Sequence, residues 1–462
     1  MPGCTAGADG DQPRPEDRPA ALRAFRERPA IRGMAGAAIA QGCAGSCGPL
    51  GARMMLTANQ ETRPGGIVVV GASASGIGVA LGLRAHGYAG TITLIGDELT
   101  LPYDRPPLSK GVLWGTHVAE DIALATAEEI SEAQIDLILG APASSLDIER
   151  KRIVLADGQQ IEYETAIIAT GASSRTLPQF DGFDNVITLR TWDDGVELQR
   201  RLGAGARLGI VGGGLIGLEV ASSAVRLGVD VTVVEPTAQP LANRITPVLS
   251  EWLLQQHRDH GVKLHLNAVC TDVVVDGPSV AALHLSDGSL VPVDVVLVSV
   301  GAAPNVGWLE GSGLELDNGV VVDQFQRAAE DVYAVGDIAN GYHPVYQRRM
   351  RMETRSNATE GADHLARTLT GSTKPYAPVP FFWTDQYDFK LQSFGLVAME
   401  DAFEFSWGAL EDGKWGLVGR RDGALTGFFS RGFGPQLAQH RRDLNDSFER
   451  SLEQTLTKGV VQ

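Results

Sequence analysis

The stretch IVVVGASASGIGVALGLRAHGYAGTITLIG, residues 67–96, decides the fold of this chain. It opens with four β-branched residues and closes with a second apolar run, and a Gly-rich turn and a helix-like segment lie between. This pattern predicts a βαβ unit that binds a dinucleotide phosphate at the turn. Gly71 and Gly76 retain two of the three fingerprint glycines. Ser73 replaces the middle glycine and can donate its hydroxyl to phosphate, and Ser75 lies in the same turn. Taken alone, this turn is either an altered cradle that still binds a dinucleotide or only a tight turn between strand and helix.

The same pattern returns at RLGIVGGGLIGLEVASSAVRLGVDVTVVE, residues 207–235. Gly212, Gly214 and Gly217 supply the complete glycine fingerprint between a strand and a helix. Glu235 ends the second strand, where a carboxylate accepts a hydrogen bond from a ribose 2′-hydroxyl and repels a 2′-phosphate. This second unit is therefore predicted to bind NAD in preference to NADP.

The rest of the chain follows the same division. Each βαβ unit precedes a β-rich stretch and a strand that ends in glycine, and aromatic strands dominate the C-terminal part. The sequence predicts an α/β fold with two Rossmann-like dinucleotide-binding domains and a C-terminal α+β domain. The predicted divisions are an N-terminal extension at 1–64, a first dinucleotide-binding domain at 65–178 and 299–375, a second at 179–298, and the C-terminal domain at 376–462.

Composition excludes several classes of function. The 462 residues carry a formal charge of −17, and an acidic chain is a poor binder of nucleic acid. No apolar run approaches the ~20 residues of a membrane span, so no membrane partner is expected. Four cysteines are too few for a disulfide-stapled secreted scaffold, which favours a reducing, cytoplasmic location.

Residues 1–64 differ from the rest of the chain. They are rich in Ala, Gly, Pro and Arg and hold three of the four cysteines. Two of these, spaced C-x-x-x-C, could form half of a metal site, but no second pair exists, so no metal is predicted. We expect this extension to be disordered, or to precede a true start at Met54 or Met55, with order beginning at Ile67. A chain that begins at Met55 is then expected to bind its cofactors.

Four further segments follow the two βαβ units at defined positions in the sequence. They are GDELTLPYDRPPLSK (96–110), SVGAAPN (299–305), VYAVGDIAN (332–340) and FWTDQ (382–386). In this order and spacing they resemble the FAD-dependent NADH:ferredoxin reductases of bacterial oxygenase systems, over about residues 65–460. The resemblance implies that the first domain binds FAD, the second binds NADH and the third covers the flavin.

The resemblance also implies roles for single positions. Asp97 would hold the FAD ribose, and Asp337 would anchor the ribityl chain of the flavin. Arg105 and Lys110 correspond to residues against the isoalloxazine and the pyrophosphate. The other implied cofactor contacts are Thr170, Gly171, Arg190, Gly301 and Trp383.

Lys110 and Glu219 are the predicted catalytic residues, because related flavoprotein reductases hold a Lys–Glu pair near flavin N5. In a desolvated pair the lysine would stabilise the developing anion, while the glutamate keeps the lysine charged and oriented. Arg355 departs from the family, which usually has an apolar residue there. Two interpretations stay open: Arg355 lies at the pyrimidine edge of the flavin and favours its anionic reduced form, or it points to solvent.

The electron acceptor is expected to be a separate protein. The PYDRPPLSK segment lacks the CxxxxC pair of disulfide reductases, and no cysteine occurs between Cys47 and Cys270. The resemblance implies that single electrons pass to a ferredoxin-type [2Fe–2S] protein or a rubredoxin that serves an oxygenase. Two alternatives remain: an NADH oxidase that uses oxygen, and a slow-turnover FAD-binding signalling or scaffold protein resembling apoptosis-inducing factors.

Docking of an acidic ferredoxin on an acidic chain requires a local basic patch. The first candidates are Arg348, Arg349 and Arg351, and the second are Arg420, Arg421 and Arg431. His257 and His260 lack a matching pair of metal ligands and are expected at the surface.

Overall fold

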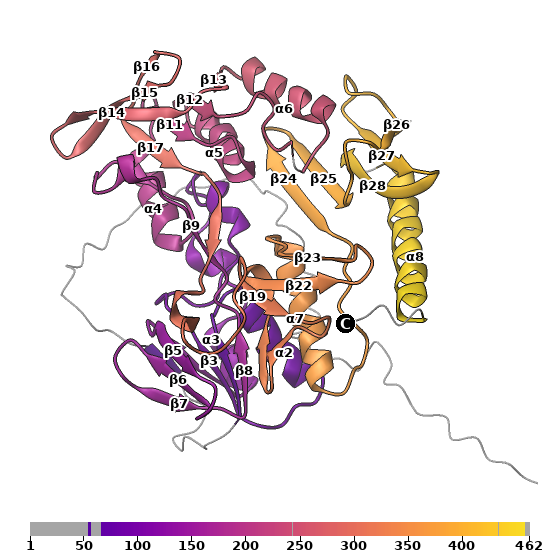
Figure 1. The fold of residues 1–462 in the computed structure, drawn as a ribbon. Coiled ribbons are helices and arrows are strands. Elements are labelled where there is room, and N and C mark those ends of the chain that lie inside the picture. Colours follow the sequence, from indigo (N-terminus) through magenta and orange to yellow (C-terminus); the bar gives the residue numbers. More distant parts are fainter. Residues whose placement is uncertain (1–53, 57–65, 243, 433, 458–462) are drawn as a thin grey trace, which may run out of the picture.

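The first sheet is assembled from two distant parts of the chain. A computed structural model describes residues 54–56, 66–242, 244–432 and 434–457. Seven strands pair in the order β1–β4–β3–β2–β8–β21–β20 (Figure 1). Their bounds are β1 Met54–Leu56, β2 Ile67–Val70, β3 Ile92–Ile95, β4 Ile135–Leu139, β8 Thr165–Ile168, β20 Arg327–Ala329 and β21 Val332–Ala334. Because β21 pairs in parallel with β8, the later segment completes the sheet that the first βαβ unit begins.

Helices and β-hairpins cover the two faces of this sheet. One face packs against α2 (Ala74–Ala85), α3 (Ala127–Glu132) and α7 (Arg355–Leu369). The other face packs against a meander and a small sheet, formed by β5 Ala143–Asp147, β6 Arg152–Leu155, β7 Gln160–Glu162, β19 Val320–Val322, β22 Ala339–His343 and β23 Arg348–Met350. Since both faces are covered, all four residues of the apolar strand β2 are buried.

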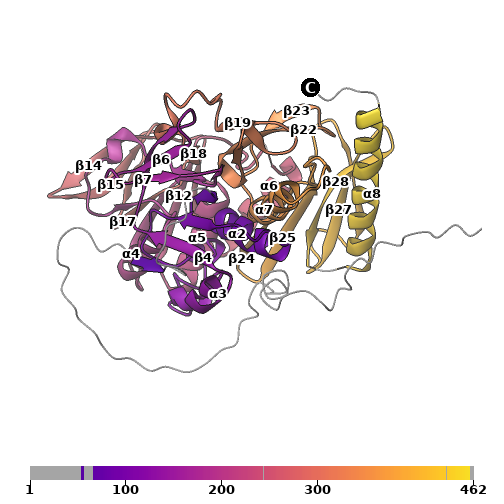
Figure 2. The ribbon, with the colours of Figure 1, turned by 90° about the horizontal axis from the view of Figure 1, so that it is seen from below.

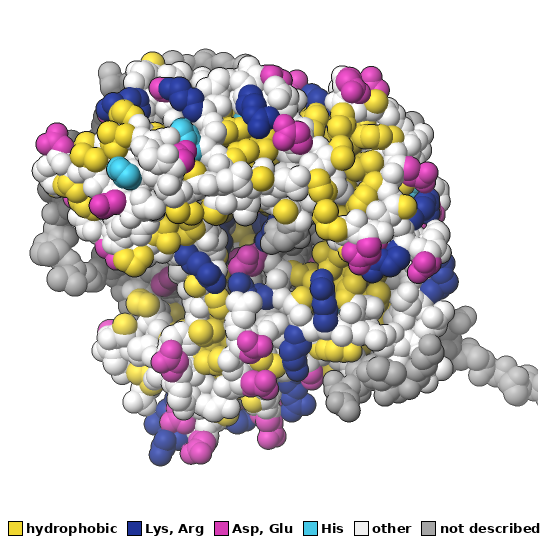
Figure 3. Space-filling model, turned by 45° about the horizontal axis from the view of Figure 1, so that its top comes forward, with side chains coloured by type: hydrophobic (Ala, Val, Ile, Leu, Met, Phe, Trp, Pro, Cys, Tyr) yellow, Lys and Arg dark blue, Asp and Glu magenta, His cyan; other side chains and the backbone are white. Residues whose placement is uncertain are grey.

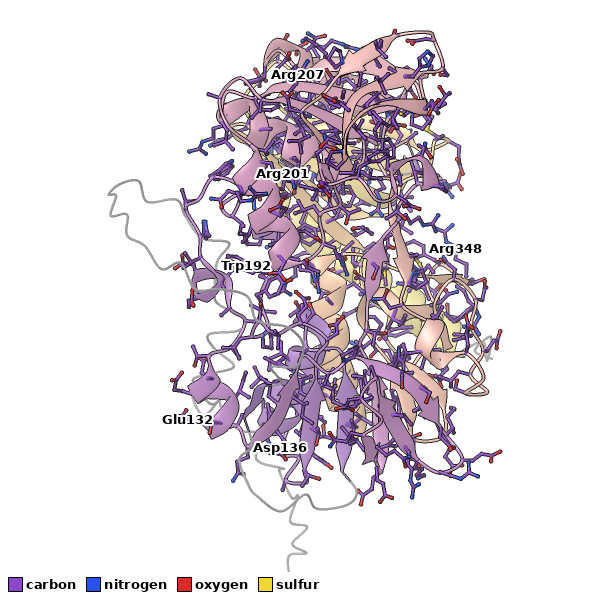
Figure 4. The ribbon with its side chains drawn as sticks, turned by 90° about the vertical axis from the view of Figure 1, so that its left-hand side faces the viewer. Glu132, Asp136, Trp192, Arg201, Arg207 and Arg348 are labelled. Atoms are coloured by element: carbon purple, nitrogen blue, oxygen red, sulfur yellow. The ribbon has the colours of Figure 1, made fainter. Side chains whose placement is uncertain are left out.

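The second unit is a parallel sheet in the order β10–β17–β11–β12–β13. Its elements are β10 Val186–Ile187, β11 Arg207–Val211, β12 Asp230–Glu235, β13 Lys263–Leu266 and β17 Val295–Val298, with α4 Trp192–Arg201, α5 Leu215–Arg226 and α6 Pro247–Asp259 and the antiparallel strands β14 Cys270–Asp276, β15 Ser279–Leu285 and β16 Leu290–Pro292. The chain crosses between the units twice, through the paired strands β9 (Ala172–Ser174) and β18 (Ala302–Pro304). Figure 4 shows this unit above the first sheet, with Trp192 of α4 between them.

The C-terminal part is an antiparallel sheet in the order β24–β25–β28–β27–β26. Its elements are β24 Phe381–Gln386, β25 Phe389–Gly395, β26 Ala402–Trp407, β27 Trp415–Arg421, β28 Ala424–Arg431 and α8 Pro435–Thr457. One face packs against α8, which lies on the outer side of the molecule (Figure 2). The opposite face packs against α6 of the second unit. The sheet is therefore held between two helices.

Ordered structure begins before Ile67, which differs from the sequence-based expectation. Met54–Leu56 form β1, which pairs antiparallel with β4 at the edge of the first sheet. Three residues are too few to show a strand period, so this strand carried no sequence signal. A chain that begins at Met55 would lose the first residue of β1. The remaining predictions for 1–64 fall outside the described residues.

Candidate functional site

The first glycine cradle joins β2 to α2. Gly71 has a φ of +111°, in the left-handed region that favours glycine, and a Cβ there would lie 2.2 Å from the carbonyl oxygen of Ala169. A Cβ on Gly76 would lie 1.8 Å from the carbonyl oxygen of Gly71. Both positions therefore require glycine, and the helix starts directly against the strand end. Ser73 precedes the helix, and its hydroxyl makes no capping hydrogen bond.

A cavity of about 300 Å³ opens at this cradle. Five predicted cofactor residues line it beside Arg105: Gly71, Ser73, Asp97, Thr170 and Arg190. Gly71 follows β2 and Asp97 follows β3, so the cavity lies at the carboxyl ends of two parallel strands. Ligands of open α/β sheets bind at this edge. Sequence reasoning missed Asn305 and Trp308, which also line the cavity.

A second cavity of about 250 Å³ adjoins the first and shares five lining residues with it. Six further predicted site residues line this second cavity: Ser75, Lys110, Gly171, Glu219, Asp337 and Trp383. They come from the first unit, the second unit and the C-terminal sheet, so the site forms only where the three parts meet. Figure 3 shows a hollow near the middle of the face that it draws, with charged side chains of both signs around the hollow.

Arg190 and Asp337 form an ion pair on the wall of the second cavity. Arg190 Nη2 lies 3.1 Å from Asp337 Oδ2. Burial raises the pKa of the Asp337 carboxyl, and the charge of Arg190 opposes that rise. Arg190 Nε is buried and has no hydrogen-bond partner among the described residues, and neither has Trp308 Nε1 in the first cavity. Buried donors without partners are rare, and a ligand rich in acceptors would satisfy these two. The residues present therefore fit a dinucleotide such as FAD.

Arg105 connects the walls of the two cavities. Its Nη2 lies 2.8 Å from Glu98 Oε1, its Nε donates to Ser73 Oγ, and its Nη1 donates to the carbonyl oxygen of Arg190. Glu98 also accepts a hydrogen bond of 2.5 Å from the Tyr103 hydroxyl. Glu98 and Tyr103 thus orient Arg105, although sequence reasoning passed over both. They lie inside the quoted segment 96–110, which is the signal that could have identified them.

The predicted pair Lys110 and Glu219 is in direct contact. Lys110 Nζ lies 2.6 Å from Glu219 Oε2, and the side chain of Glu219 is 9% exposed. The Ser109 hydroxyl donates to the same oxygen at 2.6 Å, and the Thr384 hydroxyl donates to Glu219 Oε1 at 2.7 Å. Three side-chain donors therefore converge on one buried carboxylate. Ser109 and Thr384 were not predicted, although each lies within a quoted segment.

Arg355 lies at the start of α7 and lines the second cavity. Its guanidinium forms an ion pair with Asp104 and donates to the Thr359 hydroxyl. The interpretation in which it points freely to solvent therefore does not hold. The positive charge stands at the cavity wall with a carboxylate partner.

The second glycine cradle joins β11 to α5. Gly212 has a φ of +110°, and a Cβ on Gly217 would lie 2.3 Å from the carbonyl oxygen of Gly212. A Cβ on Gly214 would have no atom closer than 3.9 Å, so the cradle is open on that side. Glu235 closes the other side, where its Oε2 accepts a hydrogen bond of 2.8 Å from the Gly213 N–H. The carboxylate is thereby held at the cradle.

Gly76, Gly212, Gly214, Gly217 and Glu235 line neither cavity, and the same holds for Gly301. It follows β17 with a φ of +96° and is exposed, and neither cavity includes it. The Arg175 N–H donates to its carbonyl oxygen at 2.9 Å. Of the second cradle, Leu215 and Ile216 line the second cavity.

His257 contradicts the prediction of a surface histidine. It is fully buried in the interface between α6 and the C-terminal sheet, while His260 is exposed. The error arose because the sheet that covers α6 lies more than a hundred residues further along the chain and left no local signal. Cys270 is buried and free.

The described residues contain neither a metal-binding cluster nor a membrane-spanning helix. In residues 66–242, 244–432 and 434–457, with the short strand β1, no three His, Cys, Asp or Glu side chains cluster in a way that could hold a metal ion. Over the same part of the chain, every helix is too short or too polar to cross a membrane.

Known proteins share this sequence and architecture. Residues 65–362 match the family described as pyridine nucleotide-disulphide oxidoreductase. Rhodocoxin reductase of Rhodococcus erythropolis is 39% identical over 338 residues, which cover 72% of this chain and 79% of that protein. Putidaredoxin reductase of Pseudomonas putida is 35% identical over 337 residues, which cover 71% and 80%.

Solved structures agree with these sequence matches. The covalent complex of putidaredoxin reductase and putidaredoxin superposes with a TM-score of 0.78 at 30% identity, covering 84% of this chain and 93% of that chain. A ferredoxin reductase from Rhodopseudomonas palustris gives a TM-score of 0.76 at 35% identity, covering 79% and 90%. These similarities confirm the predicted fold class and the family resemblance. The chain belongs to the pyridine nucleotide-disulphide oxidoreductase family.

Proposed function

We propose that this protein is an NADH-dependent, FAD-containing reductase that passes single electrons to a ferredoxin-type [2Fe–2S] protein or a rubredoxin of an oxygenase system. One observation carries the proposal: the two nucleotide cradles open toward one cavity. Ser73 and Ser75 at the start of α2 line the second cavity, and so do Leu215 and Ile216 at the start of α5. A ligand on each cradle would therefore extend into shared space, where hydride transfer needs direct contact.

The first cradle would hold FAD. Asp97 and Ser73 stand where the adenosine end would lie, and Arg190, Asp337 and Trp383 stand around the flavin end. When bound, FAD would accept hydride from NADH and release the two electrons one at a time. The protein contributes position and charge to this chemistry. Trp383 lines the same cavity as Ser75 of α2 and would exclude water from the flavin.

The second cradle would hold NADH. The N–H groups at the start of α5 would bind the pyrophosphate, as helix N-termini do. The carboxylate of Glu235, held by the Gly213 N–H and by Thr237, would accept from the ribose 2′-hydroxyl. The same charge would reject the 2′-phosphate of NADPH.

Lys110 and Glu219 are the proposed catalytic residues. Both line the second cavity, and the lysine side chain is 14% exposed. In this desolvated setting the ammonium would favour negative charge that develops beside it. The carboxylate of Glu219 would hold the ammonium in place, since the pair is already within 2.6 Å.

The acceptor would dock as a separate protein, as the relatives' names indicate for those reductases. Arg348 and Arg349 are exposed on β23, and Arg348 projects from the side opposite α4 in Figure 4. Arg351 is withdrawn from the predicted patch, because it is buried and paired with Glu353. Arg431 is also withdrawn, since its guanidinium lies over the ring of Trp252. We place the reaction in the cytoplasm, where NADH is supplied.

The test is anaerobic stopped-flow mixing of the FAD-loaded protein with NADH, followed by addition of acceptors. Lys110→Met should slow flavin bleaching about 10²-fold with little change in NADH affinity. Lys263→Met, which removes a surface lysine paired with Asp230, should leave the rate unchanged. An unaltered rate in Lys110→Met would remove the pair from the mechanism.

The acceptor arm separates the three candidate functions. Rapid reduction of a [2Fe–2S] ferredoxin or a rubredoxin supports the proposal. Faster oxidation by dissolved oxygen than by either protein would make the chain an NADH oxidase. A long-lived charge-transfer complex with little reduction of any acceptor would instead support a signalling role.

A further inference from the structure

A line of buried polar side chains leads away from Glu219 through the interface between the second unit and the C-terminal sheet. The Gln386 side chain donates to the Thr384 hydroxyl at 3.0 Å, and Thr384 donates to Glu219. Gln386 Oε1 lies 2.9 Å from His257 Nε2, and His257 Nδ1 lies 2.7 Å from the Tyr387 hydroxyl. These contacts form one continuous row, from the second cavity to Tyr387.

The chemistry of the groups fixes the direction of every hydrogen bond in the row. Glu219 as a carboxylate can only accept, so the Thr384 hydroxyl donates its single proton to it. The Thr384 oxygen must then accept from the Gln386 amide nitrogen, which leaves Gln386 Oε1 as an acceptor. His257 therefore carries its proton on Nε2, and its Nδ1 accepts from the Tyr387 hydroxyl. Every donor in the row points toward Glu219.

The three side chains between Glu219 and Tyr387 are fully buried. Thr384, Gln386 and His257 are 0%, 2% and 0% exposed, in an interface otherwise filled by leucine, tryptophan and phenylalanine side chains. Burial lowers the pKa of His257 to about 4, so the imidazole is neutral at neutral pH, as the row requires. Polar groups in such surroundings destabilise the fold unless all their hydrogen bonds are made, and a complete network holds its members in one arrangement.

The strand pattern of β24 places this row behind the cavity wall. Alternate residues of a strand point to opposite faces, so Thr384 and Gln386 share the face toward the second unit. Trp383 points the other way, where it stacks with Phe381. The same strand thus supplies Phe382 and Trp383 to the cavity wall and two side chains to the network.

We propose that Thr384, Gln386, His257 and Tyr387 are positioning residues that orient the Glu219 carboxylate and, through it, the Lys110 ammonium. The inference rests on the proposed function, because it assigns these residues to the Lys110–Glu219 pair. The row does not conduct protons, since the Gln386 amide neither takes up nor releases one at neutral pH. It joins side chains of the second unit and of the C-terminal sheet to a lysine of the first, so the pair is set only when all three parts are docked.

Rates of flavin reduction in matched variants test the inference. Thr384→Val removes the hydroxyl at nearly constant shape, and Gln386→Leu removes the amide. Both should lower the stopped-flow rate at saturating NADH about tenfold, and the NADH concentration for half-maximal rate should stay unchanged. Thr384→Ser, which restores the hydroxyl, should recover the rate. Ser222→Ala should also keep it, although it removes a 2.6 Å hydrogen bond to the backbone N–H of Tyr387 in the same interface.

A second measurement needs no bound cofactor or turnover. Histidines labelled with ¹⁵N should include one buried ring with its proton on Nε2 at pH 7, assigned to His257 by its loss in His257→Gln. Loss of that tautomer in Gln386→Leu supports the row. A proton on Nδ1 in the wild type would reverse the donors and overturn the inference.

The outcomes also separate this inference from the proposed function. If Lys110→Met slows hydride transfer but Thr384→Val and Gln386→Leu do not, the positioning role is wrong and the proposed function stands. If Ser222→Ala slows the reaction as much as Gln386→Leu, the row merely joins the domains. If Lys110→Met has no effect, the catalytic pair and its positioning residues are both withdrawn.

Discussion

Acid should destabilise this protein through one buried side chain, His257. The perturbation is a change from pH 7.5 to pH 5, applied to the FAD-loaded wild type and to His257→Gln. Burial lowers the pKa of His257 to about 4, and Gln386, which accepts from its Nε2, opposes that shift only in part. An exposed histidine in the unfolded chain titrates near 6.5.

The sign and the magnitude follow from these two values. Between pH 6.5 and pH 4 the unfolded chain binds a proton that the folded chain rejects, so stability is complete above 6.5 and falls as the pH decreases. The two pKa values differ by about 2.5 pH units, and at about 1.4 kcal/mol for each the whole loss is roughly 3 kcal/mol. Most of that interval is crossed by pH 5, where the loss is about 2 kcal/mol.

Urea unfolding followed by tryptophan fluorescence provides the measurement. Trp252 and Trp415 pack with ring centroids 5.4 Å apart in the interface that contains His257, so their emission reports its opening. The wild type should lose about 2 kcal/mol more than His257→Gln between the two pH values. His260→Gln, at the exposed neighbour stacked on Tyr387, should behave like the wild type. Equal acid sensitivity of the wild type and His257→Gln would refute the argument.

The remaining predictions concern the coenzyme and the acceptor. Glu235→Gln should reduce the preference for NADH over NADPH, measured as the ratio of kcat/KM values, about tenfold or more, because a carboxylate held at the cradle repels a phosphate. A wild type without that preference would contradict the role of Glu235. Arg348→Glu should raise the KM for ferredoxin and leave the rate with ferricyanide unchanged, because Arg348 is exposed and lines neither cavity. Equal losses with both acceptors would withdraw the docking role.

Much of the candidate site could be predicted because its signals are local. Each cradle consists of a β-branched strand, a glycine with positive φ and a helix, which follow one another within a few residues. Contacts inside the same turn require this arrangement. The resemblance then supplied partners from separate segments, and the contact between Lys110 and Glu219 agrees with it. Glu98 and Tyr103 lie inside the quoted segment 96–110, but their part in holding Arg105 depends on contacts that only the folded chain makes.

The sequence by itself determined the two βαβ units, the cradle glycines and the acidic residue at Glu235, since strand pattern and backbone sterics act over short separations. Only the tertiary structure decided which polar side chains meet. His257 on α6 and Gln386 on β24 contact each other because two helices enclose the C-terminal sheet, and burial there makes the histidine neutral. The fold also gives neighbouring arginines of one sequence run different surroundings, since Arg348 is exposed while Arg351 is paired with Glu353. The free energy of a buried polar group depends on partners that folding brings from far along the chain, which no local pattern records.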